Sequence, residues 1–223
     1  MAELFMVRHG QASFGTDDYD RLSALGERQG EWLGEYFAER GFVFDCVLAG
    51  SMRRQRSTAA AILRGLGAAT GYEELDWLNE YDFHSLYRLA TEDYPELQDQ
   101  VLGSKADYYK GLKRVLELWS ENRISGRVPE TWTGFQDRIA AAMEHIRSLG
   151  GRRVLAVSSG GVMAAIAQQV LQAPAATAIA LNMQLRNTGV CHYYFNAQSI
   201  RLASFNNLPH LDRPERLASI SYA

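Results

Sequence analysis

Hydrophobic residues follow two different patterns along the chain, and the two patterns alternate. Short apolar runs at 4–7, 44–49 and 153–157 are typical of strands that are covered on both faces of a sheet. The stretch 22–40 instead places its apolar residues along one stripe of a helix, with Ser23 positioned as the N-cap. Strands that alternate with helices predict βαβ units, so we expect an α/β fold with a mostly parallel sheet.

One region interrupts this alternation. Between about residues 80 and 130, aromatic and acidic residues alternate with short helical windows, and we interpret this stretch as a helical insertion, a lid, within a single domain spanning 1–223. Thr133 and Gln136 are spaced as a capping box and predict the start of the next helix. The remaining predicted elements are an extended piece at 72–78, helices at 52–63, 92–102, 105–122 and 162–172, closing strands at 188–195 and 199–205, and an irregular tail after Asn206.

Length and charge narrow the class of protein. A chain of 223 residues with 47% hydrophobic content can bury one large core. A net charge of −3 gives no general attraction to nucleic acid or to an anionic membrane, so any phosphate site must be built locally. Cys46 and Cys191 lie in apolar stretches and predict buried, reduced thiols. With no signal-peptide pattern at the first residues and no apolar run of membrane-spanning length, we expect a cytoplasmic protein.

Polar clusters follow three of the predicted strands. The first strand ends on Arg-His-Gly at 8–10, the second leads to Arg54 one helical turn later, and the third ends on Ser-Ser-Gly-Gly at 158–161. Parallel strands end at the same edge of a sheet, so these groups are expected to converge. Two guanidiniums, an imidazole and N–H groups at helix N-termini suit a phosphate dianion. Taken alone, Arg-His-Gly also fits a solvated strand end followed by a turn.

Arg54 lies where a helix does not favour a positive charge. The first turn of a helix prefers acids, because the helix dipole is positive there, yet Arg53, Arg54 and Arg56 are clustered at this start. A surface position is the simpler alternative for Arg54. A bound anion explains the basic cluster better than helix stability does.

Four ordered motifs resemble those of the histidine phosphatase superfamily, the phosphoglycerate mutase-like proteins. Arg-His-Gly-Gln at 8–11 is similar to the family's Arg-His-Gly-Glu/Gln opening, and 22–29 is similar to its Leu-Thr-x-x-Gly-x-x-Gln helix start. Residues 52–59 resemble the Leu-x-Arg-Ala-x-Gln-Thr-Ala helix, and 78–80 the Leu-x-Glu element. The resemblance implies a three-layer α/β/α sandwich with a mostly parallel central sheet and a helical insertion over the site.

The resemblance also implies a two-step phosphoryl transfer that needs no metal and no cofactor. His9 would be the nucleophile and become a phosphohistidine, and Arg8 and Arg54 would neutralise the phosphoryl oxygens. Glu80 would be the general acid and then the general base, with a pKa raised by burial or by a neighbouring acid such as Asp82. Without the resemblance, a solvated loop carboxylate is the simpler interpretation of Glu80.

One position departs from the family pattern. The family reads Ser-His-Gly-Gly after the third strand, whereas Ser159 stands here in place of the pocket's second histidine. Loss of one transition-state donor typically costs ~2.7–4 kcal/mol. The Ser159 hydroxyl and the N–H groups of Gly160 and Gly161 are candidates to recover part of this loss, and His210 in the tail is a candidate replacement imidazole. We therefore expect weaker phosphate binding, and turnover that is slow or restricted to favourable substrates.

The residues around the motifs favour a phosphatase over a mutase. The mutase opening, Arg-His-Gly-Glu-Ser-x-Trp-Asn, is absent, and the residues after Glu80 are aromatic and acidic rather than basic. We expect a phosphomonoester phosphatase acting through a phosphohistidine on His9, with a small-molecule phosphomonoester or phosphate as partner. A phosphate- or phosphoprotein-binding pseudoenzyme is the alternative, followed by a phosphoglycerate mutase. An open sheet edge permits a homodimer. The candidate aromatic wall of the substrate pocket, which could equally be the core of the lid, consists of Phe14, Tyr81, Phe83 and Tyr87.

Overall fold

A single mixed sheet forms the centre of the molecule. The computed structural model describes residues 2–13, 20–98, 105–150 and 153–222. Within them, the strand order is β3-β2-β4-β1-β5-β6, with β1, β2, β3 and β4 parallel and with β5 and β6 antiparallel to their neighbours. The strands are β1 (Ala2–Arg8), β2 (Cys46–Ala49), β3 (Glu73–Glu74), β4 (Arg153–Ser158), β5 (Val190–Phe195) and β6 (Ile200–Asn207).

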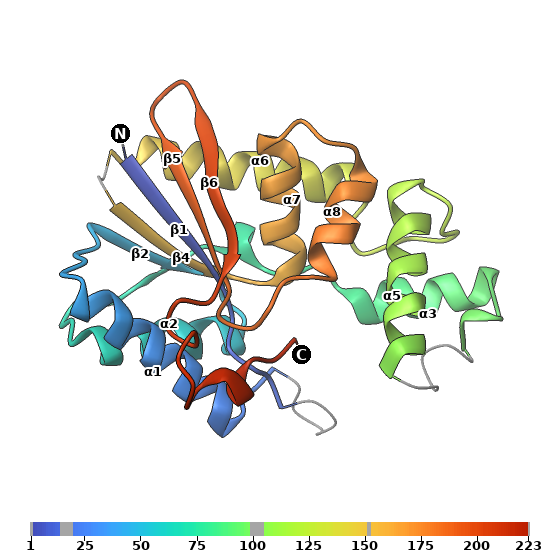
Figure 1. Cartoon of the computed structure of the whole chain (residues 1–223). Coiled ribbons are helices and arrows are strands. Elements are labelled where there is room, and N and C mark those ends of the chain that lie inside the picture. The colour runs from blue at the N-terminus through green and yellow to red at the C-terminus, as the bar shows by residue number, and fades with distance from the viewer. Residues whose placement is uncertain (1, 14–19, 99–104, 151–152, 223) are drawn as a thin grey trace.

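Helices cover both faces of this sheet, as Figure 1 shows. α1 (Ala24–Glu39) and α2 (Arg53–Leu66) lie on one face, and α6 (Trp132–Ser148) and α7 (Gly160–Val170) lie on the other. The predicted three-layer α/β/α sandwich with a mostly parallel sheet is therefore confirmed. The remaining described helices are α3 (Phe83–Asp93), α5 (Lys105–Ser120) and α8 (Ala175–Asn182), with short 3₁₀ turns η1 (Asp76–Leu78) and η2 (Leu217–Ser219).

The unbroken apolar run of β1 follows from its central position. Successive side chains of a strand point to opposite faces. Phe5 and Val7 accordingly join the core beneath α1 and α2, while Leu4 and Met6 join the core beneath α6 and α7. Because both faces are covered, the four positions 4–7 are all apolar, as the sequence predicted.

The predicted helix at 92–102 is not one continuous helix: 92–93 end α3, 97–98 are helical again, and 99–102 lie outside the described residues. The structure has α3 at Phe83–Asp93, with Asp82 as its N-cap accepting a hydrogen bond from the Ser85 N–H at 3.0 Å. This helix ends at Tyr94, which precedes Pro95, and a residue before proline disfavours the helical conformation. The proline therefore prevents one helix from running across the predicted range, part of which lies outside the described residues.

Two further boundaries differ from the prediction. Helix α6 begins at Trp132 with Thr131 as its N-cap, whose hydroxyl accepts from the Gly134 N–H at 3.0 Å, so Thr133 lies inside the helix and caps nothing. The extended piece at 72–78 is reduced to the two residues of β3 followed by η1. Helix α8, which follows Pro174, was not predicted because its mostly apolar sequence has no amphipathic period.

The insertion between β3 and α6 shares the main hydrophobic core. α3 and α5 lie side by side at the end of the molecule near α8 (Figure 1). Leu118 and Trp119 of α5 belong to the same buried cluster as Leu4 and Met6 of the sheet. The described part of the insertion is thus attached to the sheet by packing. Whether it acts as a lid stays a prediction.

Glycines bring α1 and α2 into close contact. A Cβ added to Gly34 would lie 2.1 Å from the Ile62 carbonyl oxygen, and one added to Gly65 would lie 2.0 Å from the Glu31 carbonyl oxygen. The backbones therefore approach at a distance that no other residue allows. This contact fixes α2, and with it the position of Arg54, relative to the sheet.

We expect Gly34→Ala to lower the free energy of unfolding by ~1–3 kcal/mol, because the methyl group overpacks this contact. Helix propensity alone predicts the opposite sign, a gain of ~0.5–1 kcal/mol. Chemical denaturation measures the difference. Gly71→Ala is the control, since a Cβ at Gly71 has nothing within 4 Å. A Gly34→Ala variant as stable as the parent would contradict the close packing.

Candidate functional site

His9 lies at the carboxyl end of β1 in a single orientation. Its Nδ1 is 2.8 Å from the Gly10 carbonyl oxygen, so Nδ1 carries the proton and Nε2 keeps its lone pair. The residue is only 3% exposed. Burial lowers the pKa of His9 well below its ordinary value of 6.5, and Arg54 and Arg8 lower it further. The ring is therefore a neutral imidazole with its free nitrogen available to attack.

Arg8 is held by carbonyl oxygens from two distant segments. Its Nη1 donates to the Leu185 carbonyl at 2.6 Å and to the Tyr222 carbonyl at 2.7 Å. A Cβ added to Gly160, the first residue of α7, would lie 3.6 Å from Arg8 Nε. This ordinary contact distance places two of the predicted phosphate-binding residues together, whereas the group that a Cβ at Gly160 would overlap is the Asn182 side chain, with Oδ1 at 2.5 Å.

Arg54 lies in the first turn of α2 and pairs with an acid of the same chain. Its Nη1 donates to Asp20 Oδ1 at 2.7 Å, and the Arg53 N–H donates to Asp20 Oδ2 at 2.8 Å. Arg54 is 6% exposed, so it is not the surface residue of the simpler alternative. The sequence predicted an anion beside the basic start of this helix. In the structure, the Asp20 carboxylate is that anion.

Glu80 lies against the N-terminus of α7. Its Oε2 accepts from the Gly161 N–H at 2.9 Å, and a Cβ at Gly161 would lie 2.4 Å from Oε1. Burial raises the pKa of Glu80 above its ordinary 4.5, although the Gly161 N–H and the charges of Arg54 and Arg8 act in the opposite direction. The Gly161 N–H, expected to help bind phosphate, is therefore engaged by the carboxylate.

Asp82 does not contribute to this pKa shift. Burial acts to raise the pKa of Asp82, but hydrogen bonds from Ser85 and the nearby His84 outweigh it and lower the pKa. The carboxylate serves as the N-cap of α3. Two causes were predicted for the raised pKa of Glu80, burial and a neighbouring acid. Burial is the cause, and Asp82 is not.

Ser159 occupies the N-cap position of α7 and is fully buried. Its hydroxyl accepts a hydrogen bond from Gln55 Nε2 at 2.9 Å. The preceding Ser158 donates instead to the Leu78 carbonyl at 2.7 Å. The position that carries the second histidine in the family is therefore linked to a buried glutamine of α2.

His210 has a different location from the one proposed for a replacement imidazole. Its Nε2 is 2.9 Å from Thr188 Oγ1, and the Thr188 N–H in turn contacts the Arg8 carbonyl at 3.1 Å. The ring thus lies behind the backbone of the Arg-His-Gly motif. Burial lowers the pKa of His210 to about 3, with a further contribution from Arg216, so the imidazole is neutral and structural.

The aromatic residues near Glu80 belong to the core beneath the insertion. The Tyr81 ring packs against Trp119 and Phe135 at centroid distances of 5.0 and 5.6 Å, and its hydroxyl accepts from Asn182 at 3.1 Å. Phe83 and Tyr87 pack against the same core. The structure therefore supports the interpretation that these rings belong to the core of the insertion and not to the wall of a substrate pocket. Phe14 lies outside the described residues.

Sequence reasoning missed three groups at this site. Asp20, Gln55 and the backbone carbonyl of Tyr222 all contact predicted site residues. A carboxylate shortly before the Leu-Ser-x-x-Gly helix start and a glutamine where the family has alanine were both visible signals. The Tyr222 carbonyl had none, because a backbone group carries no sequence information.

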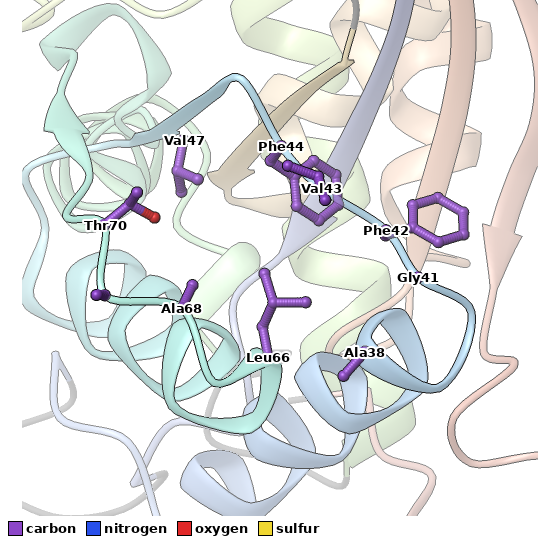
Figure 2. Close-up of a pocket in the computed structure, with 10 residues that line it drawn as sticks. Ala38, Gly41, Phe42, Val43, Phe44, Val47, Leu66, Ala68 and Thr70 are labelled. Atoms are coloured by element: carbon purple, nitrogen blue, oxygen red, sulfur yellow. The ribbon is translucent and has the colours of Figure 1, made fainter.

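A pocket of about 370 Å³ lies elsewhere, between the C-terminal ends of α1 and α2 and the segment before β2 (Figure 2). It is lined mainly by apolar side chains and lies at the amino end of the strands, opposite the site. The lining residues are Ala38, Gly41, Phe42, Val43, Phe44, Val47, Leu66, Ala68, Ala69 and Thr70.

The described residues offer no candidate metal centre. They contain no group of three or more His, Cys, Asp or Glu side chains that could hold a metal ion. Both cysteines are free; Cys46 is half-buried, and burial raises the pKa of Cys191 to about 12. No helix in this part of the chain has both the length and the apolar character needed to cross a membrane.

Known proteins resemble the chain in sequence and in fold. A Hydrogenobacter thermophilus protein named "Putative phosphoserine phosphatase 2" is 24% identical over 223 residues, covering 94% of this chain and 98% of that protein. A mutant phosphoserine phosphatase from Entamoeba histolytica, solved with phosphoserine, has a TM-score of 0.66 at 17% identity and covers 95% of this chain and 100% of its own.

A phosphoglycerate mutase from Bacillus anthracis has the same TM-score of 0.66 at 16% identity, with 94% of each chain covered. Since a phosphatase and a mutase are equally similar in structure, these two likenesses establish the fold and not the activity. The family model described as histidine phosphatase superfamily (branch 1) matches residues 4–208, which is most of the sequence. The chain therefore belongs to branch 1 of the histidine phosphatase superfamily.

Proposed function

We propose that the chain is a phosphomonoester phosphatase that acts through a phosphohistidine on His9. The observation that carries the proposal is the tautomer of His9. The 2.8 Å contact between Nδ1 and the Gly10 carbonyl leaves Nε2 as a nucleophile, and burial, with the nearby guanidiniums of Arg54 and Arg8, lowers the pKa of the ring and keeps it neutral. A nucleophile of this kind beside two cations suits attack on an anionic phosphoryl group.

In the first step, Nε2 of His9 attacks phosphorus and the bond from phosphorus to the ester oxygen breaks. The protonated Glu80 gives its proton to the leaving alkoxide and becomes a carboxylate. In the second step, Glu80 takes a proton from water, the water oxygen bonds to phosphorus, and the N–P bond returns its electron pair to Nε2. Phosphate is released and both side chains regain their starting protonation. Arg8 and Arg54 stabilise the charge on the phosphoryl oxygens in both transition states.

The proposed substrate is a small phosphomonoester with little net charge beyond its phosphate. Arg8 and Arg54 are the cations that bear on the pKa of both His9 and Glu80, and Asp20 already neutralises part of Arg54. A bisphosphate would need further basic groups. Phosphoserine, named for the Hydrogenobacter relative and present in the Entamoeba structure, fits this class.

Phosphate binding without turnover is the second candidate function. It is favoured by Ser159, which replaces a cationic imidazole with a neutral hydroxyl already bonded to Gln55. The two functions differ in one measurable respect, the release of phosphate that depends on His9.

We expect the wild-type chain to hydrolyse p-nitrophenyl phosphate and His9→Ala to lose at least about a thousandfold in kcat, because the covalent route is removed. Phosphate release and trapping of a phosphorylated chain by acid quench measure the two steps. His145→Ala, on the surface helix α6, is the matched control. Wild-type activity no higher than that of His9→Ala would favour the binding function.

The pH profile should show two limbs with an optimum on the acidic side of neutrality. His9 must be neutral, and because its pKa lies well below 6.5, activity should persist below that pH. Glu80 must be protonated for the first step, so kcat/KM should fall as pH rises through a pKa above 4.5. The measurement is kcat/KM for phosphoserine against pH.

Glu80→Gln supplies the control for this profile. It should remove the alkaline limb and lower kcat/KM for an alkyl phosphate by ~10²–10⁴-fold, and much less for p-nitrophenyl phosphate, whose leaving group needs no proton. An alkaline limb that survives unchanged in Glu80→Gln would assign that limb to another group.

Asp20→Asn should strengthen phosphate binding. The carboxylate and an incoming phosphate compete for the Arg54 guanidinium, and the ion pair is partly exposed, so we expect the inhibition constant of inorganic phosphate to fall about twofold to fivefold. Competitive inhibition at low and high salt measures this. Asp212→Asn, an exposed residue of the tail, is the control. Weaker inhibition by phosphate would instead show that Asp20 positions Arg54 for binding.

A further inference from the structure

Gln55 and Ser159 form a fully buried polar pair next to the nucleophile. Both residues have no exposed surface. Gln55 Nε2 donates to Ser159 Oγ at 2.9 Å and to the Leu78 carbonyl at 3.0 Å, and its Oε1 accepts from the Met52 N–H at 3.3 Å. The amide is therefore fixed at both ends and cannot rotate without losing hydrogen bonds in a dry environment.

Ser159 of this pair follows β4 and His9 follows the neighbouring β1, at the same level of the sheet. Arg8 of β1 pairs in parallel with Ser158 of β4, and the His9 N–H donates to the Ser158 carbonyl at 2.9 Å. Ser159 and His9 are the next residues of their two strands. His9 itself is only 3% exposed. A hydrogen-bond donor placed beside this imidazole must therefore be buried as well, and Ser159 is.

The two positions exchange size relative to the family pattern. The motif that residues 52–59 resemble has alanine where this chain has Gln55, and the motif after the third strand has histidine where it has Ser159. The family's alanine is replaced by the larger Gln55, and its histidine by the smaller Ser159. The hydrogen bond between Gln55 and Ser159 shows that the glutamine side chain reaches the space that the histidine would fill. Gly50 makes room for it, since a Cβ there would lie 1.9 Å from Gln55 Oε1.

The direction of the hydrogen bond decides what the hydroxyl can do. Both amide protons of Gln55 Nε2 are used, one of them on Ser159 Oγ, so the serine oxygen is the acceptor in this bond. A serine hydroxyl has one proton to give in addition. With its lone pair held by Gln55, that proton is directed away from the amide.

We propose that Gln55 is a positioning residue that aims the Ser159 hydroxyl proton at the transferring phosphoryl group, so that the pair replaces the family's second pocket histidine. The inference rests on the proposed phosphatase function. It makes Ser159 a transition-state donor whose orientation depends on α2, and it predicts that the two side chains act as one unit.

A double-mutant cycle tests this coupling. Ser159→Ala and Gln55→Leu should each lower kcat for p-nitrophenyl phosphate about tenfold to hundredfold with little change in KM, and the double variant should lose no more than one of them. Affinity for vanadate, which imitates the five-coordinate transition state, should fall in parallel with kcat, while affinity for inorganic phosphate changes less. Gln169→Leu, which removes a half-buried amide on α7 away from the site, is the matched control.

A second arm restores the family pair. Ser159→His alone should lower activity and thermal stability, because Gln55 occupies the space that the imidazole needs. Gln55→Ala with Ser159→His should fit and regain at least wild-type kcat. Recovery of thermal stability alone would reflect only the relieved overlap, so kcat and vanadate affinity are the readouts of this arm.

The outcomes separate the inference from the function beneath it. Ser159→Ala at wild-type kcat and vanadate affinity, or singles whose losses multiply in the double variant, would overturn the role of the pair while His9-dependent turnover remained. Phosphate release by the wild type at the same rate as by His9→Ala would overturn the phosphatase function itself. If Ser159→His alone exceeds wild type, Gln55 does not occupy the imidazole's place and the proposal is wrong.

Discussion

One backbone register underlies the candidate site: Arg8 of β1 lies opposite Ser158 of β4 in a parallel pair. The His9 N–H bond to the Ser158 carbonyl, at 2.9 Å, continues this pairing one residue beyond the strand. His9, Arg8 and the Ser-Gly-Gly turn therefore leave the sheet at one level. Because side chains alternate between faces, a shift of one residue would turn the imidazole to the opposite side of the sheet.

Charges at this edge are partly balanced within the chain. A neutral imidazole, two guanidiniums and a buried carboxyl lie together, and Asp20 neutralises part of Arg54. The same burial lowers the pKa of His9 and raises that of Glu80, so one environment prepares a base and an acid at once. Dry surroundings also strengthen every interaction with an anion that enters.

The sequence predicted the sheet, its helices and the convergence of Arg8, His9, Arg54 and Glu80, since each depends on local apolar pattern or on motif order. It misplaced the helix near Pro95 and the start of α6, because competing caps such as Thr131 and Thr133 look alike in one dimension. The roles of Asp20 as partner of Arg54 and of Gln55 as partner of Ser159 depend on contacts between side chains of different elements. That information appears only when the chain is folded, as does the structural place of His210 behind Thr188.

The contact between Arg8 and the Tyr222 carbonyl joins the site to the last described residues of the chain. Ser221 accepts from Gln29 of α1 at 3.0 Å and donates to Asn187 at 2.9 Å, and Asn187 donates to the His9 carbonyl at 3.2 Å. This tail segment is held by a few polar bonds and not by a large apolar core. Its local unfolding should therefore need less free energy than global unfolding, and it would remove the Tyr222 carbonyl from Arg8 and the Ser221 hydroxyl from Gln29 and Asn187 together. As conditions become denaturing, activity should be lost while the sheet and its two helical layers remain intact.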